Sequence, residues 1–153
     1  MTDPTLGALI VDQSPDGIIF AGPDGNIQVW NDAAATIFGF SAEEAIGKSL
    51  DIIIPEQFRE AHWRGFDNAI NTGVTKLHGQ ALPTRATTAA GETLYVELSF
   101  SLIRDASGTI LGAVANCRDI NERFQQDRAN RRRLRELEAL VKESQPAKDA
   151  PAS

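Results

Sequence analysis

The sequence predicts an α+β fold: a five-stranded antiparallel sheet with helices packed on one face, followed by a separate C-terminal helix. The order of the segments predicts this fold, because two strand-like segments come first, helical segments follow, and three strand-like segments come after them. Turn residues separate the strands within each group, as short connections between antiparallel neighbours require. At 153 residues, the chain can enclose one core and a small ligand pocket, but it is too short for two domains.

The first elements are a short helix and a pair of strands. Apolar side chains at helical spacing predict an N-terminal helical segment within residues 1–14. Residues 17–21 are rich in β-forming side chains, and residues 26–30 alternate apolar with polar side chains, which is typical of a half-buried strand. Residues 22–25, Gly-Pro-Asp-Gly, predict the turn between them, because proline presets φ and glycine accepts a positive φ.

Two short helices are predicted next. Either Asn31 or Asp32 is expected to cap the first helix, and Gly39 is expected to end it. Ser41 and Glu44 have the spacing of a capping box, in which each side chain bonds the backbone N–H of the other residue. This pattern predicts that a second helix begins at Ser41.

A longer helix follows, with Pro55 in its first turn and Gly73 at its C-terminal end. Phe58, His62 and Phe66 recur at a spacing of four residues, so they share one face of this helix. We therefore expect the His62 imidazole to lie in an apolar wall between two aromatic rings.

The next 45 residues predict three strands. Residues 74–88 are a long stretch of mixed polarity that Pro83 interrupts, and residues 93–104 alternate apolar with polar side chains. Residues 105–108 predict a hairpin turn, and residues 109–118 are rich in Ile, Leu and Val. The last strand of the sheet is therefore expected to end near residue 118.

From Asp119 onward the apolar pattern becomes helical. Side chains at alternating spacings of four and three residues resemble a coiled-coil seam with a polar middle: Ile120, Phe124, Asp127, Arg131, Leu134, Leu137 and Val141. We expect residues 119–144 to form a dimerisation helix in a homodimer. Residues 145–153 are rich in Pro, Ala and polar side chains and are predicted to be disordered.

The composition excludes several classes of protein. The net charge of −6 argues against nucleic acid or an anionic membrane as the main partner. The sequence has neither an apolar run long enough to span a bilayer nor the pattern of a signal peptide, so a cytoplasmic location is expected. Cys117 is the single cysteine and is expected to be a small buried side chain. We find no catalytic motif, so no enzymatic activity is expected.

Five segments carry a resemblance to a known family. They are PDGI at 15–18, DGNI at 24–27, WNDAA at 30–34, FGFSAEEAIGK at 38–48, and GAV at 112–114 continuing to RDINER at 118–123. Together they resemble PAS domains over about residues 7–125, with Asn121 where the family usually has Thr. The resemblance implies a PAS fold, a sensory domain over residues 15–118, and a last strand that leads into a signalling helix.

A narrower resemblance concerns the helix that carries His62. The segment PEQFREAH at 55–62, followed by Thr72-Gly73, is similar to the haem-binding PAS domains of FixL-type oxygen-sensor kinases and of bacterial haem-regulated phosphodiesterases. In those proteins the matching histidine is the proximal ligand of haem b, so the resemblance implies that His62 binds the iron. A neutral imidazole is a good iron ligand, and Phe58 and Phe66 suit the apolar faces of a porphyrin.

The distal side departs from both groups of haem proteins. The oxygen sensors have an Arg where this chain has Leu82, and the phosphodiesterases have a Met ligand where it has Gln80. Leu98 and Phe100 fall at positions that are apolar on the distal side in the family. Gln80 and His78 are the polar candidates in a largely apolar pocket. The resemblance therefore implies CO, NO or iron redox state as the input, in preference to O2.

Two other functions remain open at this point. One is a ligand-free module for dimerisation or protein interaction, which the apolar sheet and the seam helix favour. The other is a PAS pocket for a different small molecule. No kinase, cyclase or DNA-binding segment follows the helix, so the chain is expected either to act on a downstream signalling protein or to be a sensor excised from a longer protein.

Overall fold

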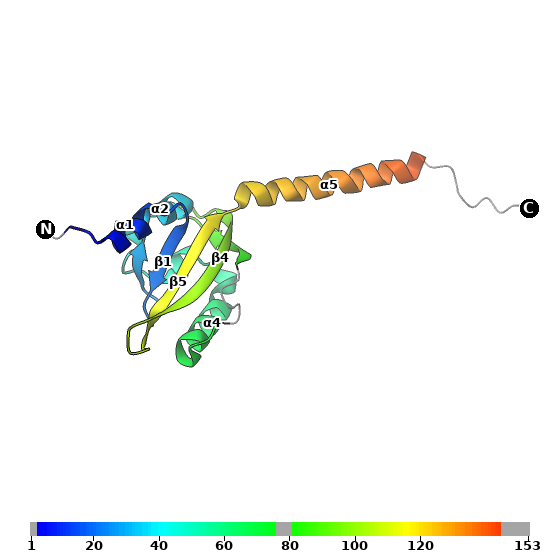
Figure 1. Cartoon of the computed structure of the whole chain (residues 1–153). Helices are drawn as coiled ribbons and strands as arrows, with labels where there is room; N and C mark the ends of the chain where they lie inside the picture. Colours follow the sequence, from blue (N-terminus) through cyan, green and yellow to red (C-terminus); the bar gives the residue numbers. More distant parts are fainter. Residues whose placement is uncertain (1–2, 76–80, 145–153) are drawn as a thin grey trace, which may run out of the picture. The chain divides into compact units, whose positions relative to one another are not determined.

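The computed structural model describes residues 3–75 and 81–144 of the chain. It separates into two compact units, one ending at Ile120 and the other beginning at Asn121. The first unit holds the sheet and its covering helices, and the second contains helix α5 (Asn121–Ser144) (Figure 1). None of the described helices is both long enough and apolar enough to cross a membrane.

Five antiparallel strands form one sheet in the order β2-β1-β5-β4-β3. The strands are β1 (Gly17–Ala21), β2 (Ile27–Trp30), β3 (Leu82–Thr87), β4 (Thr93–Arg104) and β5 (Ile110–Asp119). The first and last strands of this unit, β1 and β5, are neighbours in the sheet. Gly17 pairs with Cys117, and Ala21 pairs with Ala113. The predicted α+β fold with a five-stranded antiparallel sheet is confirmed.

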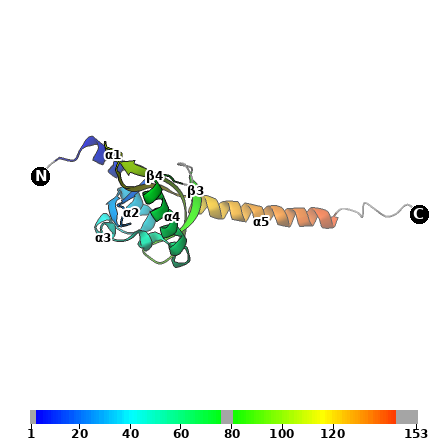
Figure 2. The same cartoon turned by 90° about the horizontal axis from the view of Figure 1, so that it is seen from below.

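Helices cover one face of this sheet (Figure 2). They are α2 (Asp32–Phe38), α3 (Ala42–Ala45), the 3-10 turns η1 (Leu50–Ile53) and η2 (Glu56–Phe58), and α4 (Arg59–Thr72). Helix α1 (Leu6–Gln13) precedes the sheet and packs against α2. The core lies between the helices and the sheet, and its most deeply buried side chains include Ile19, Ile27, Phe38 and Val96.

Alternation along the strands decides which side chains face the helices. Successive side chains of a strand point to opposite faces, so alternate residues of β4 and β5 turn toward the covered face. These are Val96, Leu98 and Phe100 on β4, and Ala113, Ala115 and Cys117 on β5. Because the β5 side chains are small, space remains between this part of the sheet and α4.

The predicted helix caps are present. Asn31, and not Asp32, caps α2, and its side-chain oxygen accepts the N–H of Ala34 at 3.0 Å. The capping box is complete, since the Ser41 hydroxyl accepts the N–H of Glu44 at 3.1 Å and the Glu44 carboxylate accepts the N–H of Ser41 at 3.0 Å. These caps position the short helices before the chain enters α4.

Two predicted boundaries at the sheet were wrong, and the helix that carries His62 begins only at Arg59, after η2, and not with Pro55 in its first turn. The third strand starts only at Leu82 and includes Pro83, which pairs with Glu97. Proline is tolerated there because β3 is an edge strand, where a ladder hydrogen bond is not needed on the outer side. The second error concerns Ile120, which is 5% exposed and donates its N–H to the Tyr95 carbonyl at 3.1 Å, so it belongs to the core of the first unit and not to the helical seam.

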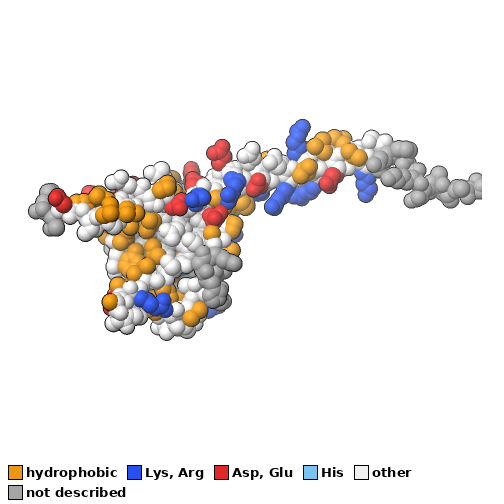
Figure 3. Space-filling model, viewed as in Figure 1, with side chains coloured by type: hydrophobic (Ala, Val, Ile, Leu, Met, Phe, Trp, Pro, Cys, Tyr) orange, Lys and Arg blue, Asp and Glu red, His pale blue; other side chains and the backbone are white. Residues whose placement is uncertain are grey.

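Helix α5 exposes its apolar stripe. Leu134, Leu137, Leu140 and Val141 are 58%, 45%, 60% and 53% exposed, and none of the α5 residues is buried. Figure 3 shows basic side chains along the middle of this helix and a hydrophobic patch farther along it. An exposed apolar stripe is thus present on α5 from Leu134 onward, and its pairing with a second helix stays a prediction.

Candidate functional site

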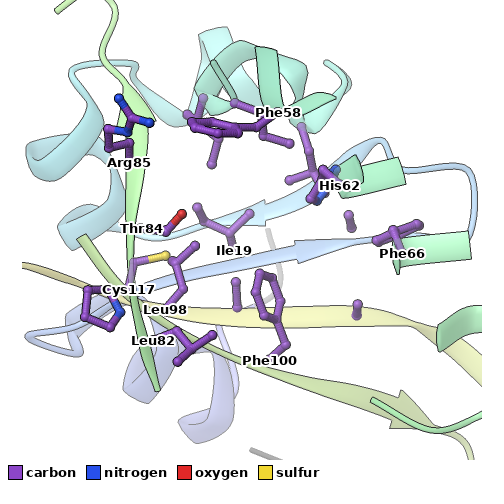
Figure 4. Close-up of a pocket in the computed structure, with 17 residues that line it drawn as sticks. Ile19, Phe58, His62, Phe66, Leu82, Thr84, Arg85, Leu98, Phe100 and Cys117 are labelled. Carbon is purple, nitrogen blue, oxygen red and sulfur yellow. The ribbon is translucent and has the colours of Figure 1, made fainter. Parts of the chain in front are cut away.

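An apolar cavity of about 250 Å³ lies between α4 and the covered face of the sheet (Figure 4). Strands β1, β4 and β5 supply its apolar floor, η1 and α4 supply one wall, and β3 supplies another. Most of the lining is hydrocarbon, and the polar exceptions are His62, Thr84, Arg85 and the thiol of Cys117. A few polar groups around an apolar space are typical of a small-molecule site.

His62 projects from α4 into the wall of this cavity. Its Nδ1 atom is buried and has no hydrogen-bond partner among the described residues. Burial lowers the pKa of His62, although the negative charges of Asp51 and Asp67 oppose part of that effect. The imidazole is therefore held in its neutral form at neutral pH, which is the form that coordinates a metal.

The aromatic neighbours of His62 hold its ring in place. The centroid of the Trp63 ring lies 4.7 Å from that of His62, and the Phe66 ring lies 6.0 Å away. Trp63 is itself fixed, because its indole N–H donates to the Asp51 carboxylate at 2.7 Å. The indole ring also occupies the space where a side chain at Gly25 would project, so the left-handed turn at Gly25 must carry glycine.

Most of the predicted site residues meet in this one cavity. Phe58 and Phe66 line it from the helical side, and Leu82, Leu98 and Phe100 line it from the strands. Gln80 and His78 fall outside the described residues, so their predicted distal place remains a prediction. The spacing of four residues was the signal that placed His62 with Phe58 and Phe66, although Phe58 lies in η2, directly before α4.

Sequence reasoning missed three polar or polarisable side chains of the lining. Thr84 and Arg85 were overlooked because residues 74–88 gave no clear strand register. The Arg85 guanidinium carbon lies 4.9 Å from the centroid of the Phe58 ring. Cys117 was expected to be a small buried side chain and is 1% exposed, and burial raises the pKa of its thiol to about 12.

A second cavity of about 240 Å³ adjoins the first. Both cavities are lined by His62, Phe66, Phe100 and Ala113, so these side chains form the boundary between them. A typical site for a drug-sized ligand has roughly 300–1000 Å³. Each cavity alone falls below that range, and the two together fall within it.

The potential metal ligands at this cavity suit an iron that is already coordinated by a porphyrin better than a bare metal ion. The described residues contain no group of three or more His, Cys, Asp or Glu side chains that could hold a bare metal ion. His62 offers one neutral nitrogen in an apolar surrounding. Haem iron needs only one or two protein ligands, because the porphyrin supplies the other four nitrogens.

Comparison with known proteins identifies the family. The family model described as "PAS domain" matches residues 15–122. A solved structure of a PAS domain from a Colwellia psychrerythraea protein superposes with a TM-score of 0.66 at 22% identity, covering 76% of this chain and 95% of that one. At that identity, the likeness concerns the fold alone.

Two curated bacterial proteins are similar in sequence. An uncharacterized protein of Azorhizobium caulinodans is 31% identical over 121 residues, which is 78% of this chain and 16% of the relative. The oxygen sensor protein DosP of Escherichia coli is 23% identical over 109 residues, which is 63% of this chain and 14% of the relative. The chain thus spans about one sixth of the length of these relatives.

Proposed function

Because the chain belongs to the PAS domain family, a family of sensory modules, we propose that it senses by binding haem b through His62. The proposal makes it a non-catalytic sensor whose input is a diatomic gas or the redox state of the iron. The observation that carries it is a neutral histidine with an unpartnered buried Nδ1 atom at an apolar cavity. Similarity to an oxygen sensor of Escherichia coli supports the same choice.

The residues around the cavity have distinct parts in this proposal. His62 would supply a nitrogen ligand to the iron, and Trp63 and Phe66 keep its ring oriented. Phe58, Leu98 and Phe100 exclude water and provide apolar contact for a planar ring. Haem, when bound, supplies an iron centre that takes up a diatomic gas or an electron.

The size of the site sets a condition on haem binding. A porphyrin exceeds the 250 Å³ cavity, but the adjoining cavity of about 240 Å³ shares His62, Phe66 and Phe100 with it. Haem uptake therefore requires the two cavities to join, with His62 at their common boundary. We expect uptake to be slower than a simple encounter, because packed aromatic side chains must rearrange first.

The relay in this proposal is α5, paired with a second copy of the chain. Strand β5 lines the cavity through Ala113, Ala115 and Cys117 and ends at Asp119, with one residue between it and the start of α5 at Asn121. A ligand that pushes on these side chains changes the position of the strand from which the helix starts. The homodimer and the downstream signalling protein are parts of the proposal.

Hemin titration tests the proposal. The protein, purified without added haem, is titrated with hemin and followed by the Soret absorbance and by quenching of tryptophan fluorescence. We expect saturation at one hemin per chain, and strong quenching because Trp63 contacts His62.

The matched variants are His62→Leu, which keeps an apolar side chain in the wall, and Arg64→Gln on the exposed face of the same helix. We expect at least a tenfold weaker affinity for His62→Leu and no change for Arg64→Gln, since loss of a metal-ligand bond costs well over 1.4 kcal/mol. Equal hemin affinity in wild type and His62→Leu contradicts the proposed ligation. Absence of stoichiometric uptake by the wild type contradicts haem binding as a whole.

A further inference from the structure

Arg85 brings a positive charge to the rim of the apolar cavity. Among the described lining residues it is the only side chain with a permanent charge. Its guanidinium lies over the ring of Phe58, with 4.9 Å between Cζ and the ring centroid, and Phe58 also lines the cavity. Thr84, the neighbouring residue of β3, adds a hydroxyl to the same wall (Figure 4).

The charge of Arg85 is not used within the described part of the chain. No carboxylate of those residues forms an ion pair with it, whereas Arg64 pairs with Glu60 and Arg118 pairs with Asp16. A guanidinium presents N–H groups in a planar fork that matches the two oxygens of a carboxylate. A cation held against an aromatic ring at an apolar cavity is suited to an apolar ligand with an anionic end.

We propose that this cavity binds an unbranched aliphatic carboxylate, with the carboxylate on Arg85 and the hydrocarbon chain against Ile19, Leu98 and Phe100. A slender chain can enter the 250 Å³ cavity without joining it to the adjoining one, which distinguishes it from a porphyrin. Because neither iron nor an imidazole ligand is needed, this binding goes beyond the proposed haem function and does not depend on it.

The two ends of such a ligand contribute differently to affinity. Each methylene buried in the cavity contributes about 0.8 kcal/mol, so each added carbon should tighten binding about fourfold until the cavity is full. The Arg85 side chain is exposed, and an exposed ion pair contributes only about two- to fivefold. That contribution should weaken as salt is added.

Calorimetric titration of the full-length, haem-free protein tests the proposal with octanoate, decanoate and 1-decanol. We expect one decanoate per chain, bound about tenfold or more tighter than octanoate and about two- to fivefold tighter than 1-decanol at low ionic strength. Arg85→Gln should remove the preference for decanoate over 1-decanol. Arg64→Gln, an exposed arginine on α4 outside the lining, should leave the preference unchanged.

Variants of the cavity separate this proposal from haem binding. Ala115→Phe fills the cavity floor and should abolish decanoate binding, with the fold checked by circular dichroism and by the urea midpoint. His62→Leu should still bind decanoate, even though it should lose hemin. Equal affinity for decanoate and 1-decanol, or an Arg85→Gln variant that keeps the preference, overturns the proposal. Failure of hemin binding alone leaves decanoate binding intact and affects only the haem proposal.

Discussion

The burial of His62 affects protonation and metal binding in opposite directions. Desolvation disfavours the charged imidazolium, so the pKa of His62 lies below its ordinary value. Protons compete with iron for an imidazole nitrogen, and a lowered pKa therefore keeps the ligand available at mildly acidic pH. The same burial destabilises the protein without haem once the pH falls far enough to protonate this side chain.

The first residue-scale prediction concerns stability against pH. In the unfolded chain His62 titrates near its ordinary pKa of about 6.5, and in the folded chain it titrates lower. The unfolded state thus binds more protons, and His62 favours folding fully above about pH 6.5 and progressively less as the pH falls through the folded pKa. Urea unfolding of wild type and His62→Leu at pH 7.5 and pH 5 measures the difference.

We expect the wild type to lose more stability than His62→Leu between these two pH values. The comparison with the variant removes the contributions of the carboxylates and of His78, which both proteins share. Parallel losses in the two proteins contradict a lowered pKa at His62.

A second residue-scale prediction concerns Leu82, which lines the cavity on β3. An apolar side chain there offers no charge-assisted hydrogen bond to a diatomic gas, whereas such a bond contributes about 1.5–3 kcal/mol. Leu82→Arg should therefore raise the oxygen affinity of the haem-loaded protein about tenfold or more and slow its autoxidation. CO affinity should change less, and Leu82→Met is the control without charge.

The spectra of the ferrous protein under air and under CO measure these affinities. Equal oxygen affinity in the wild type and in Leu82→Arg shows that Leu82 does not face the gas.

At the scale of elements, one buried side chain joins three segments. The Asn31 amide is 1% exposed; its oxygen accepts the N–H groups of Ile18 and Ala34, and its nitrogen donates to the carbonyls of Val11 and Asp16. These bonds connect the end of α1, the start of β1 and the start of α2. Strand β1 carries Ile19 into the cavity, so Asn31 also positions the cavity floor.

Asn31→Ala should destabilise the protein by about 3 kcal/mol, because four backbone groups in a buried region lose a partner. Asn26→Ala is the matched control, since the Asn26 amide lies in an exposed turn and bonds only Asp24 among the described residues. We expect that control to change the free energy of unfolding by less than about 0.5 kcal/mol. Equal urea midpoints for the two variants contradict the structural role of Asn31.

Elements were predictable from sequence where local rules decide them. Strands β1 and β4 match the predicted ranges at both ends, and the capping box at Ser41 is present, because alternation and capping are local signals. The bounds of strand β3 within residues 74–88 were not predictable, because its polarity is mixed and its Pro83 is acceptable only at an edge that the sequence does not reveal. The four-residue spacing of Phe58, His62 and Phe66 predicted the helical side of the site, whereas no sequence signal placed Arg85 in the lining.

At the scale of the whole molecule, the exposed apolar stripe of α5 favours pairing with a second helix. Helices in proteins gain most of their stability from packing of an apolar face, and the stripe of α5 at Leu134, Leu137, Leu140 and Val141 is exposed. Pairing with the same stripe of a second copy buries apolar surface on both helices. The polar middle at Asp127 and Arg131 weakens such a pair, which suits a sensor that must change state.

Sedimentation of the full chain measures this association. We expect a dimer in the micromolar range for the wild type and a monomer for Leu134→Asp/Leu137→Asp, because two charges in an apolar seam cannot be buried unpaired. Ala139→Asp lies on a different face of α5 and should remain dimeric. A wild-type chain that is monomeric at tens of micromolar contradicts the homodimer.

The central claim, that His62 binds haem iron, is tested most directly by rescue with free imidazole. His62→Gly removes the ligand and leaves room for an imidazole molecule beside Phe66 and Trp63. The account predicts that His62→Gly takes up hemin weakly, and that added imidazole restores the wild-type Soret spectrum and one-to-one binding. If His62→Gly instead binds hemin as wild type does, with the same spectrum and without imidazole, then His62 is not the ligand.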